Sequence, residues 1–232
     1  MKYKNNINNL IKLKKEIIKL QANEDNDIKE LLRWRKKLKK KSKIKTKLIN
    51  LDECKDWYLD KNKNLYHKSG QFFKVQGVKI SGASLREVKS WTQPILTQKH
   101  GGILAFICRV TKKKGVQFLL EGKTEPGDNA DVKITSCFQA TQSNMNRAHG
   151  GKKTPLSGIV LKKTKKNIIG ATIHYEEGAR FWQKPNKNLL IKISNKDAKK
   201  IKNENFIWLT LSQIKKLNQK PGIINPFVKT IL

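Results

Sequence analysis

The stretch Leu119–Asn144, LLEGKTEPGDNADVKITSCFQATQSN, decides the fold predicted for this chain. It begins inside the apolar run Val116–Leu120, interrupted only by Gln117, which predicts a buried strand. A Pro126-Gly127 turn follows, and then a second short strand-like segment, Val132–Phe138. Two strands joined through a turn place a sheet at the centre of the molecule.

The second segment leads directly into a run of small polar side chains, Gln139–Asn144. Polar groups gathered at a strand end suit a cleft for a hydroxyl-rich ligand, because each ligand hydroxyl needs a placed donor or acceptor. A polar loop held by local bonds between side chains and backbone explains the same composition. Both interpretations stay open at this stage.

Further strand patterns lie on either side of this stretch. An apolar run over 103–110 and a hairpin turn over 112–115 precede it, and strand-like segments occupy 71–80, 168–175, 189–193 and 206–210. The last of these is followed by a helix pattern with Leu211, Ile214 and Leu217. Several strands with few helices predict an α+β domain with a mixed sheet.

The N-terminal part is helical in pattern and basic. Residues 4–21 repeat apolar positions at helical spacing with lysines between them, and a capping box, Asp27-x-x-Glu30, predicts the start of a second helix. No internal repeat and no interior linker follow. The predicted organisation is a basic helical extension over 1–26 and one module over 27–232.

The formal net charge of +33 raises the question of nucleic acid, because basic surfaces bind phosphates. Only six of the 51 basic residues are arginine, whereas nucleic-acid sites more often recruit arginine. A coding bias toward lysine therefore explains the charge better than a dedicated nucleic-acid surface. The run Arg33–Lys47, with ten basic residues and no acid, fits an RNA or membrane surface, or a solvated helix face followed by an edge strand blunted by lysines.

Cysteines and histidines point to no metal or disulfide framework. Cys54, Cys108 and Cys137 are far apart and odd in number, and the latter two sit in apolar runs typical of small core residues. The four histidines have no metal-ligand spacing. With no signal-peptide pattern and no apolar run of membrane-spanning length, we expect a reduced, cytoplasmic protein.

Motifs spread along the chain resemble the NDP-hexose 2,3-dehydratases of deoxysugar biosynthesis over roughly residues 28–232. The order and spacing of these segments are more specific than any one short motif. They are Leu65–Phe73, Trp91–Ile95 with Gln98, Lys123–Gly127, Gln139–Asn144, Glu176–Phe181 with Asn186 and Asn188, and Trp208–Leu211.

The resemblance implies a Nudix-like α/β/α module that has lost pyrophosphate hydrolysis, with no metal and no redox cofactor. Arg86-Glu87 stands without the paired glutamates that a Nudix helix uses to hold metal. The implied enzyme is a carbon–oxygen lyase. Its substrate would be a 4-keto-6-deoxyhexose linked to dTDP or another nucleoside diphosphate, and its product a 3,4-diketo-2,6-dideoxy sugar that a C3 ketoreductase reduces next.

The elimination needs a base near C3, an acid at the C2 hydroxyl and donors for the C4 oxyanion. Under the resemblance, Glu125 or His67 transfers the proton and Lys123 stabilises the enolate. Lys123 and Glu125 are two apart, so on a strand both point to one face, although a simple ion pair has the same spacing.

The substrate-binding residues implied by the resemblance are mostly amides and hydroxyls. Arg180 is the candidate residue for binding the diphosphate. Trp182 is a candidate for stacking on the nucleobase of the substrate, and Trp91 and Phe73 are alternatives for that stacking role. The others would bind sugar and base: Gln93, Gln98, Gln139, Thr141, Gln142, Ser143, Glu176, Asn186 and Asn188.

Two departures from the family pattern stand out. Members commonly carry two copies of this module and this chain is one copy long, so we expect a homodimer. Glu121-Gly122 and Asp128 replace residues that are usually Gln-Ala and Asn. Two alternatives to the dehydratase remain: a non-catalytic nucleotide-sugar-binding module, and a basic RNA-binding protein.

Overall fold

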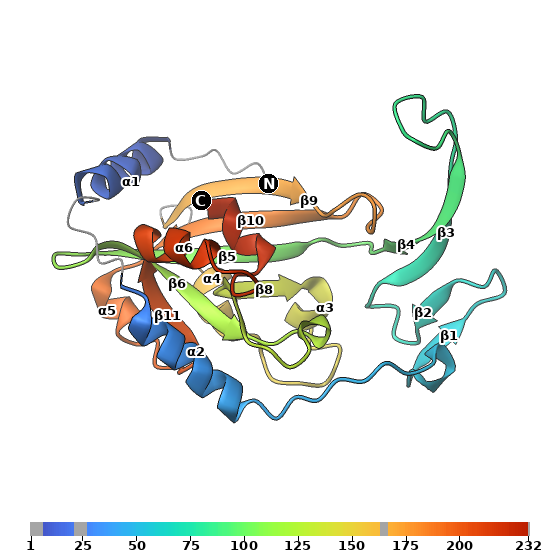
Figure 1. Ribbon diagram of the computed structural model, residues 1–232, viewed down its shortest axis with the longest axis horizontal. Helices are drawn as coiled ribbons and strands as arrows, with labels where there is room; N and C mark the ends of the chain where they lie inside the picture. Colours follow the sequence, from blue (N-terminus) through green and yellow to red (C-terminus); the bar gives the residue numbers. More distant parts are fainter. Residues whose placement is uncertain (1–6, 21–26, 163–166, 232) are drawn as a thin grey trace.

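A computed structural model describes residues 7–20, 27–162 and 167–231 and contains two separate sheets (Figure 1). The small sheet is a meander of β1 (Trp57–Leu59), β2 (Leu65–His67), β3 (Lys74–Ile80) and β4 (Trp91–Thr97). The main sheet contains β5 (Gly102–Thr111), β6 (Gly115–Lys123), β7 (Lys133–Ser136), β8 (Phe138–Thr141), β9 (Ile168–Tyr175), β10 (Pro185–Lys192) and β11 (Phe206–Thr210).

The main sheet is mixed, as the sequence predicts. Its order is β11-β6-β5-β10-β9, and β10 runs parallel to β5 while the other pairs are antiparallel. The expected strand over 132–138 is divided in two at Cys137: β7 pairs with β6 and β8 pairs with β5. The sheet therefore splits beyond the β5–β6 hairpin.

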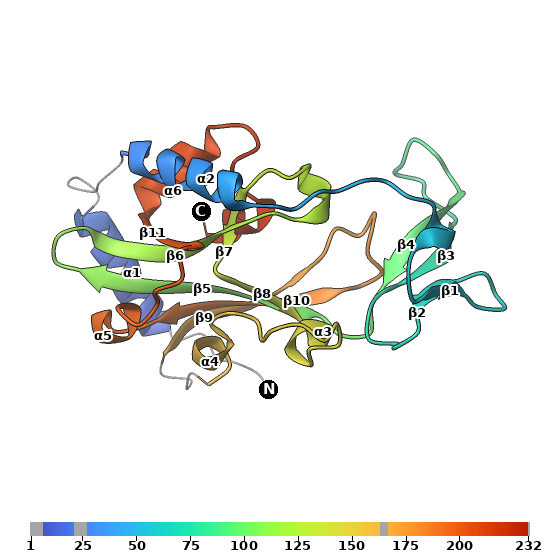
Figure 2. The same ribbon diagram turned by 90° about the horizontal axis from the view of Figure 1, so that it is seen from below.

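Helices cover both faces of the main sheet (Figure 2). One face packs against α2 (Lys29–Lys41) and α6 (Leu211–Asn218), and the other against the short helices α4 (Ser157–Val160) and α5 (Asn195–Ala198). The central strand β5 sends alternate side chains into these two cores. Phe106 and Cys108 enter the first, and Ala105 and Ile107 the second. Cys108 is fully buried, as predicted, and burial raises the pKa of its thiol to about 12.

The helix α1 (Ile7–Leu20) joins the first core although it precedes residue 27. Leu13 is 4% exposed and packs in the same cluster as Phe118 of β6. Glu16 forms an ion pair with Lys192 of β10 at 3.7 Å. The helix is thus a cover for the sheet.

Replacing Leu13 by alanine is expected to lower the free energy of unfolding by about 2–5 kcal/mol, because the substitution leaves a cavity in a packed core. Ile11 on the same helix is 47% exposed, so Ile11→Ala should cost well under half as much. Urea unfolding of both variants measures the difference. Equal losses would show that α1 does not pack through Leu13.

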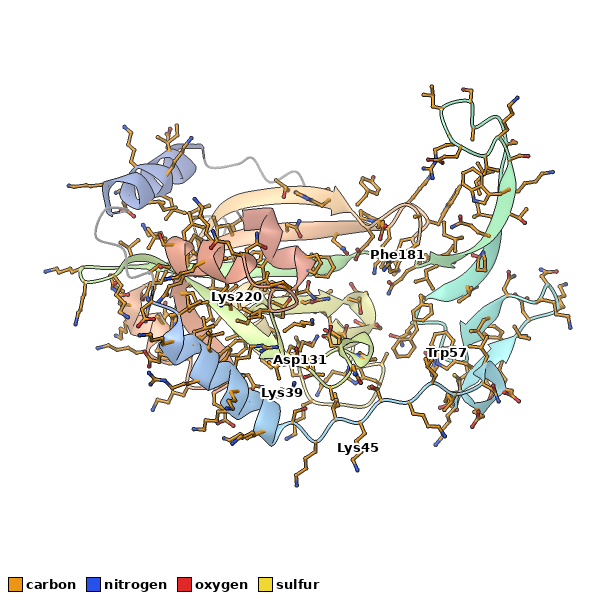
Figure 3. All side chains as sticks on the ribbon, in the orientation of Figure 1. Lys39, Lys45, Trp57, Asp131, Phe181 and Lys220 are labelled. Atoms are coloured by element: carbon orange, nitrogen blue, oxygen red, sulfur yellow. The ribbon has the colours of Figure 1, made fainter. Side chains whose placement is uncertain are left out.

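Two local predictions in the N-terminal part are wrong. The N-cap of α2 is Ile28 without a side-chain cap, and Asp27 instead accepts a hydrogen bond from the Lys29 backbone N–H at 2.9 Å. The helix begins one residue late because Ile28 is drawn into the core, where it is 5% exposed. The edge strand that one of the alternatives placed after α2 does not form: residues 42–50 are an extended connection without strand pairing, and Lys45 extends from it (Figure 3).

The small sheet stands apart from the body and has almost no core of its own (Figure 1). Among residues 57–97, Ile95 alone is buried. Leu85 is 98% exposed and Leu48, in the connection that leads to this sheet, is 96% exposed.

Within the described residues, no helix combines the length and hydropathy needed to cross a bilayer.

Candidate functional site

A polar strip crosses the main sheet on the face that carries the α2 and α6 core. Asn188 of β10 lies opposite Leu104 of β5, and Leu104 lies opposite Gln139 of β8. One row further along, Asn186 bonds to Gly102, and Gly102 lies opposite Thr141. Since alternate residues of a strand share a face, Gln139, Thr141, Asn186 and Asn188 form one strip.

Some polar side chains of this strip form hydrogen bonds within the protein, and others have polar atoms without a hydrogen-bond partner among the described residues. Asn186 accepts a hydrogen bond from the Gly102 N–H at 2.9 Å and donates one to Glu176 Oε1 at 2.7 Å. Asn188 is 8% exposed, and neither its amide nitrogen nor its amide oxygen has a partner among the described residues. The buried Oε1 of Gln139 is also without one. Buried amides are almost always hydrogen-bonded, so these atoms suit a ligand with hydroxyls or carbonyls.

Lys184 adds a buried cation to this strip, and the motif search did not select it. It is 8% exposed, with Nζ at 3.6 Å from Glu176 Oε1 and 4.6 Å from the centre of the Phe181 ring. The backbone N–H of Glu176 donates to the carbonyl of Lys184 and continues the β9–β10 ladder. In a chain so rich in exposed lysines, composition offers no signal that marks this one.

The loop between β9 and β10 fixes the small sheet to the body. The backbone N–H of Leu96 donates to the Arg180 carbonyl, and Trp182 N–H donates to the Leu96 carbonyl, both at 2.8 Å. Gln93 donates to the Ala179 carbonyl at 2.8 Å and accepts from Trp91 Nε1. Gln93 therefore has both ends of its amide engaged within the protein, and Phe181 lies at this junction (Figure 3).

Arg180 and Trp182 are placed at this junction but stay exposed. The side chain of Arg180 is 74% exposed and pairs with Glu177 at 3.2 Å, and Trp182 is 50% exposed. Each could reach a ligand at the junction. Neither is fixed by burial, in contrast to Asn186.

A cavity of about 280 Å³ lies between the small sheet and α3 (Gln142–Met145). It brings together three of the predicted binding residues, Gln98, Gln142 and Ser143. Asn146 donates to Gln71 Oε1 across it at 3.4 Å. The remaining lining residues are Gly70, Phe72, Lys99 and His100.

The polar run Gln139–Asn144 begins within β8 and continues into α3, and it contains both locally bonded side chains and polar groups that line a cavity or are buried. Thr141 is the N-cap of α3: its hydroxyl accepts from the Asn144 N–H, and its own N–H donates to Asn144 Oδ1 at 3.1 Å. This is the local bonding of the plainer interpretation. Gln139, by contrast, keeps a buried oxygen with no partner in the described part of the chain, and Gln142 and Ser143 line the junction cavity.

Lys123 and Glu125 lie at the end of β6, away from the junction cavity. Lys123 Nζ is 2.5 Å from Glu125 Oε1, with side chains 37% and 39% exposed. Lys123 lines a second cavity of about 360 Å³ with Glu121, Gly122 and Thr124. The other side of this cavity comes from α2, the residues that follow it and the loop before β11: Leu38, Lys41, Ser42, Ile44, Val132, Glu204 and Asn205.

Glu121 in this second cavity is partly buried. Burial raises the pKa of its carboxyl to about 7, Lys123 opposes the shift and Glu125 adds to it. The unfolded chain should titrate near the ordinary value of 4.5. Between pH 4.5 and pH 7 the carboxyl of Glu121 is deprotonated in the unfolded chain but still protonated in the folded protein. The contribution of Glu121 to the free energy of unfolding therefore falls as the pH rises across that window.

Wild-type protein is therefore expected to lose up to about 3 kcal/mol of stability through Glu121 between pH 4.5 and pH 8. Glu121→Gln should remove this decline, and urea unfolding at several pH values measures it. Glu204 is the control, because its exposed carboxyl pairs with Lys41 and has a lowered pKa. An unchanged pH profile in Glu121→Gln would contradict the assignment.

His67 lies in neither cavity. Its ring packs edge-on against Trp57 and Phe72, with centroids 5.5 and 4.6 Å apart, and its Nδ1 contacts Ser69 Oγ at 2.8 Å. These contacts make it part of the aromatic cluster of the small sheet. Among the described residues, no three His, Cys, Asp or Glu side chains come together in a way that could hold a metal ion.

Comparison with known proteins gives a consistent result. A family model described as NDP-hexose 2,3-dehydratase matches residues 28–232. A dTDP-4-dehydro-6-deoxy-alpha-D-glucopyranose 2,3-dehydratase of Saccharopolyspora spinosa is 30% identical over 191 residues, which are 82% of this chain and 38% of that protein. Proteins of the same name from Amycolatopsis orientalis and Streptomyces violaceoruber are 30% and 25% identical over 76% and 89% of the chain. The chain spans 37–45% of the length of these relatives.

Proposed function

The chain belongs to the NDP-hexose 2,3-dehydratase family, and from this premise we propose that it removes the C2 hydroxyl of a nucleotide-linked 4-keto-6-deoxyhexose. The observation that carries the proposal is the polar strip. Asn188 and Gln139 hold buried amide atoms that have no partner among the described residues, and they share one face of the sheet with Asn186. A hexose offers the alternating donors and acceptors that such amides need.

The chemistry begins with the C4 ketone, which acidifies the proton on C3. A carboxylate removes that proton, the enolate forms, and the C2 hydroxyl then leaves. We assign the proton transfer to Glu125 and the enolate to Lys123, whose side chains meet at the end of β6. His67 is the alternative base. The product enol becomes a 3,4-diketo-2,6-dideoxy sugar, which a C3 ketoreductase would reduce next.

The junction cavity suits the nucleotide part of the substrate. Gln98, Gln142 and Ser143 line it, and the loop that carries Arg180 and Trp182 is bonded to the neighbouring strand β4. Arg180 would clamp the diphosphate through its guanidinium, and Trp182 would stack on the base. Glu176 holds Asn186 in position through their hydrogen bond. The proposal invokes no metal and no cofactor.

Incubation with dTDP-4-keto-6-deoxyglucose tests the proposal, with mass spectrometry to detect the loss of one water. A non-catalytic nucleotide-sugar-binding module would bind the compound and return it unchanged. An RNA-binding protein would bind RNA with an affinity that falls steeply with salt and would ignore the sugar nucleotide. Asn188→Leu should weaken binding of the sugar nucleotide, because it removes the unpaired amide.

We further propose a Nudix-like origin for the module and a homodimeric state. Helices on both faces of a mixed sheet support the first. The exposed apolar side chains Tyr58, Leu59, Leu85 and Val88 of the small sheet and its β3–β4 connection support the second, because a second chain would cover apolar surface there. Light scattering at micromolar concentration should give twice the mass of the chain. A strict monomer with full activity would refute the dimer and leave the dehydratase proposal intact.

A further inference from the structure

Lys184 is a buried cation to which the proposed reaction assigns no role. Its side chain is 9% exposed, and lysine is seldom buried to this extent because its charge loses hydration. Nζ lies 3.6 Å from Glu176 Oε1, which is beyond hydrogen-bonding distance. Among the described residues, none accepts a hydrogen bond from Nζ. An ammonium group has three donors, so a ligand can use them.

The neighbours of Lys184 hold its ammonium group in place without using these donors. Glu176 Oε1 accepts a hydrogen bond from Asn186 Nδ2 at 2.7 Å and balances the charge of Lys184 from a longer distance. The ring of Phe181, with its centre 4.6 Å from Nζ, adds a cation–π attraction. Because Lys184 and Asn186 converge on one oxygen, the ammonium group lies at the end of the polar strip.

Lys184 also lies at the border between the two parts of the proposed substrate site. On one side, the amides of the polar strip that suit the hexose begin at Asn186. On the other side, the segment Gln98–His100 lines the junction cavity, which suits the nucleoside. This segment meets the start of β10, because a Cβ atom on Gly101 would lie 1.6 Å from the Pro185 carbonyl oxygen. In a sugar nucleotide the diphosphate joins the nucleoside to the sugar, so it would cross this border.

The other cation near this border is poorly suited to hold a diphosphate alone. The side chain of Arg180 is 74% exposed and pairs with Glu177, so solvent and salt screen its charge. Lys184 is buried, and a hydrogen bond from an ammonium group to a phosphate oxygen is stronger in such surroundings.

We propose that Lys184 binds the diphosphate of the sugar nucleotide and that Arg180 adds a second, exposed cation to the same site. The assignment rests on the proposed dehydratase function and deepens it, because it identifies the residue that anchors the substrate between its two halves. It also assigns two opposing effects to Glu176. This carboxylate holds Lys184 in place, and its negative charge weakens the attraction for the diphosphate.

Equilibrium titrations with dTDP and with thymidine separate the diphosphate from the nucleoside. Lys184→Met keeps the unbranched side chain and removes its charge. We expect it to weaken binding of dTDP about 10–100-fold, the loss for one hydrogen bond to a charged group, with thymidine binding unchanged. Lys192→Met is the matched control and should retain both affinities. Lys192 ends the same strand, is 37% exposed and pairs with Glu16.

Glu176→Gln separates binding by the lysine from a purely structural role. Alone, this substitution keeps an oxygen for Asn186 and removes a negative charge, so dTDP should bind more tightly. The double variant with Lys184→Met and Glu176→Gln leaves no unpaired carboxylate beside the strip. We expect this double variant to keep its fold by thermal melting and still to bind dTDP weakly.

Wild-type affinity for dTDP in Lys184→Met would overturn the assignment. Recovery of that affinity in the double variant would also overturn it, because the lysine would then serve only to neutralise Glu176. The same holds for wild-type protein that binds dTDP no more tightly than thymidine. All three results leave the dehydratase proposal standing if wild-type protein removes water from the 4-keto sugar. Wild-type protein that binds dTDP through Lys184 but removes no water rejects the proposed function and retains the binding site.

Discussion

Replacing Glu125 by glutamine is expected to lower turnover about 10²–10⁴-fold and to bring exchange of the C3 hydrogen nearly to a stop. The amide keeps the shape of the side chain but cannot accept the proton. Binding of the sugar nucleotide should change little, since the glutamines of the junction cavity and Arg180 lie on other elements. Rapid-quench turnover and nuclear magnetic resonance of the C3 position measure the two effects.

Lys123→Met provides the second arm of this experiment. Lys123 and Glu125 are paired at 2.5 Å and would act on the same step, so the double variant should be little worse than the more damaged single variant. Simple multiplication of the two losses would instead indicate independent roles. Wild-type exchange and wild-type turnover in Glu125→Gln would remove this residue from catalysis, and His67 would then be the base to test.

Gly101→Ala is expected to lower the free energy of unfolding by about 3 kcal/mol or more. A Cβ atom at this position would lie 1.6 Å from the backbone carbonyl oxygen of Pro185. A backbone oxygen cannot rotate away as a side chain can, so β5 and β10 would have to separate where the polar strip begins. Loss of sugar-nucleotide binding should therefore accompany the loss of stability.

Gly77→Ala is the matched control for this substitution. Gly77 lies in β3, and a Cβ atom there meets nothing within 4 Å. We expect its melting temperature to stay close to that of wild type. A Gly101→Ala protein with wild-type melting temperature and binding would show that the two strands approach each other less closely than described.

The parts of the fold that sequence predicted well are strands buried on both faces. The runs over 103–110 and 116–120 are mostly apolar, with Arg109 and Gln117 as the exceptions, because β5 and β6 lie between two cores. Asn186 and Asn188 were expected before a strand but lie inside β10, where polar residues interrupt the apolar pattern. The sequence also does not indicate that the small sheet is separate from the main sheet. The strands of the small sheet alternate apolar and polar residues, as any half-buried strand does.

The candidate site was predictable to the extent that its residues lie next to one another in short motifs. Lys123 and Glu125 form an ion pair and are two residues apart in the sequence, so their proximity can be predicted from the sequence alone. Lys184 and Glu121 owe their properties to burial by distant segments. Nothing local distinguishes either from the many exposed charged residues around it, so only the packed structure identifies them.

The thin core of the small sheet has a consequence for the dynamics of the amide protons. With Ile95 as its one buried residue and few backbone bonds to the loop after β9, this sheet should open without global unfolding. Its amides would then exchange with solvent far faster than those of β5 and β6. A nucleotide seated against Gln71 and Gln98 would close this opening, so slowed exchange in β2–β4 would report binding even in a variant without turnover.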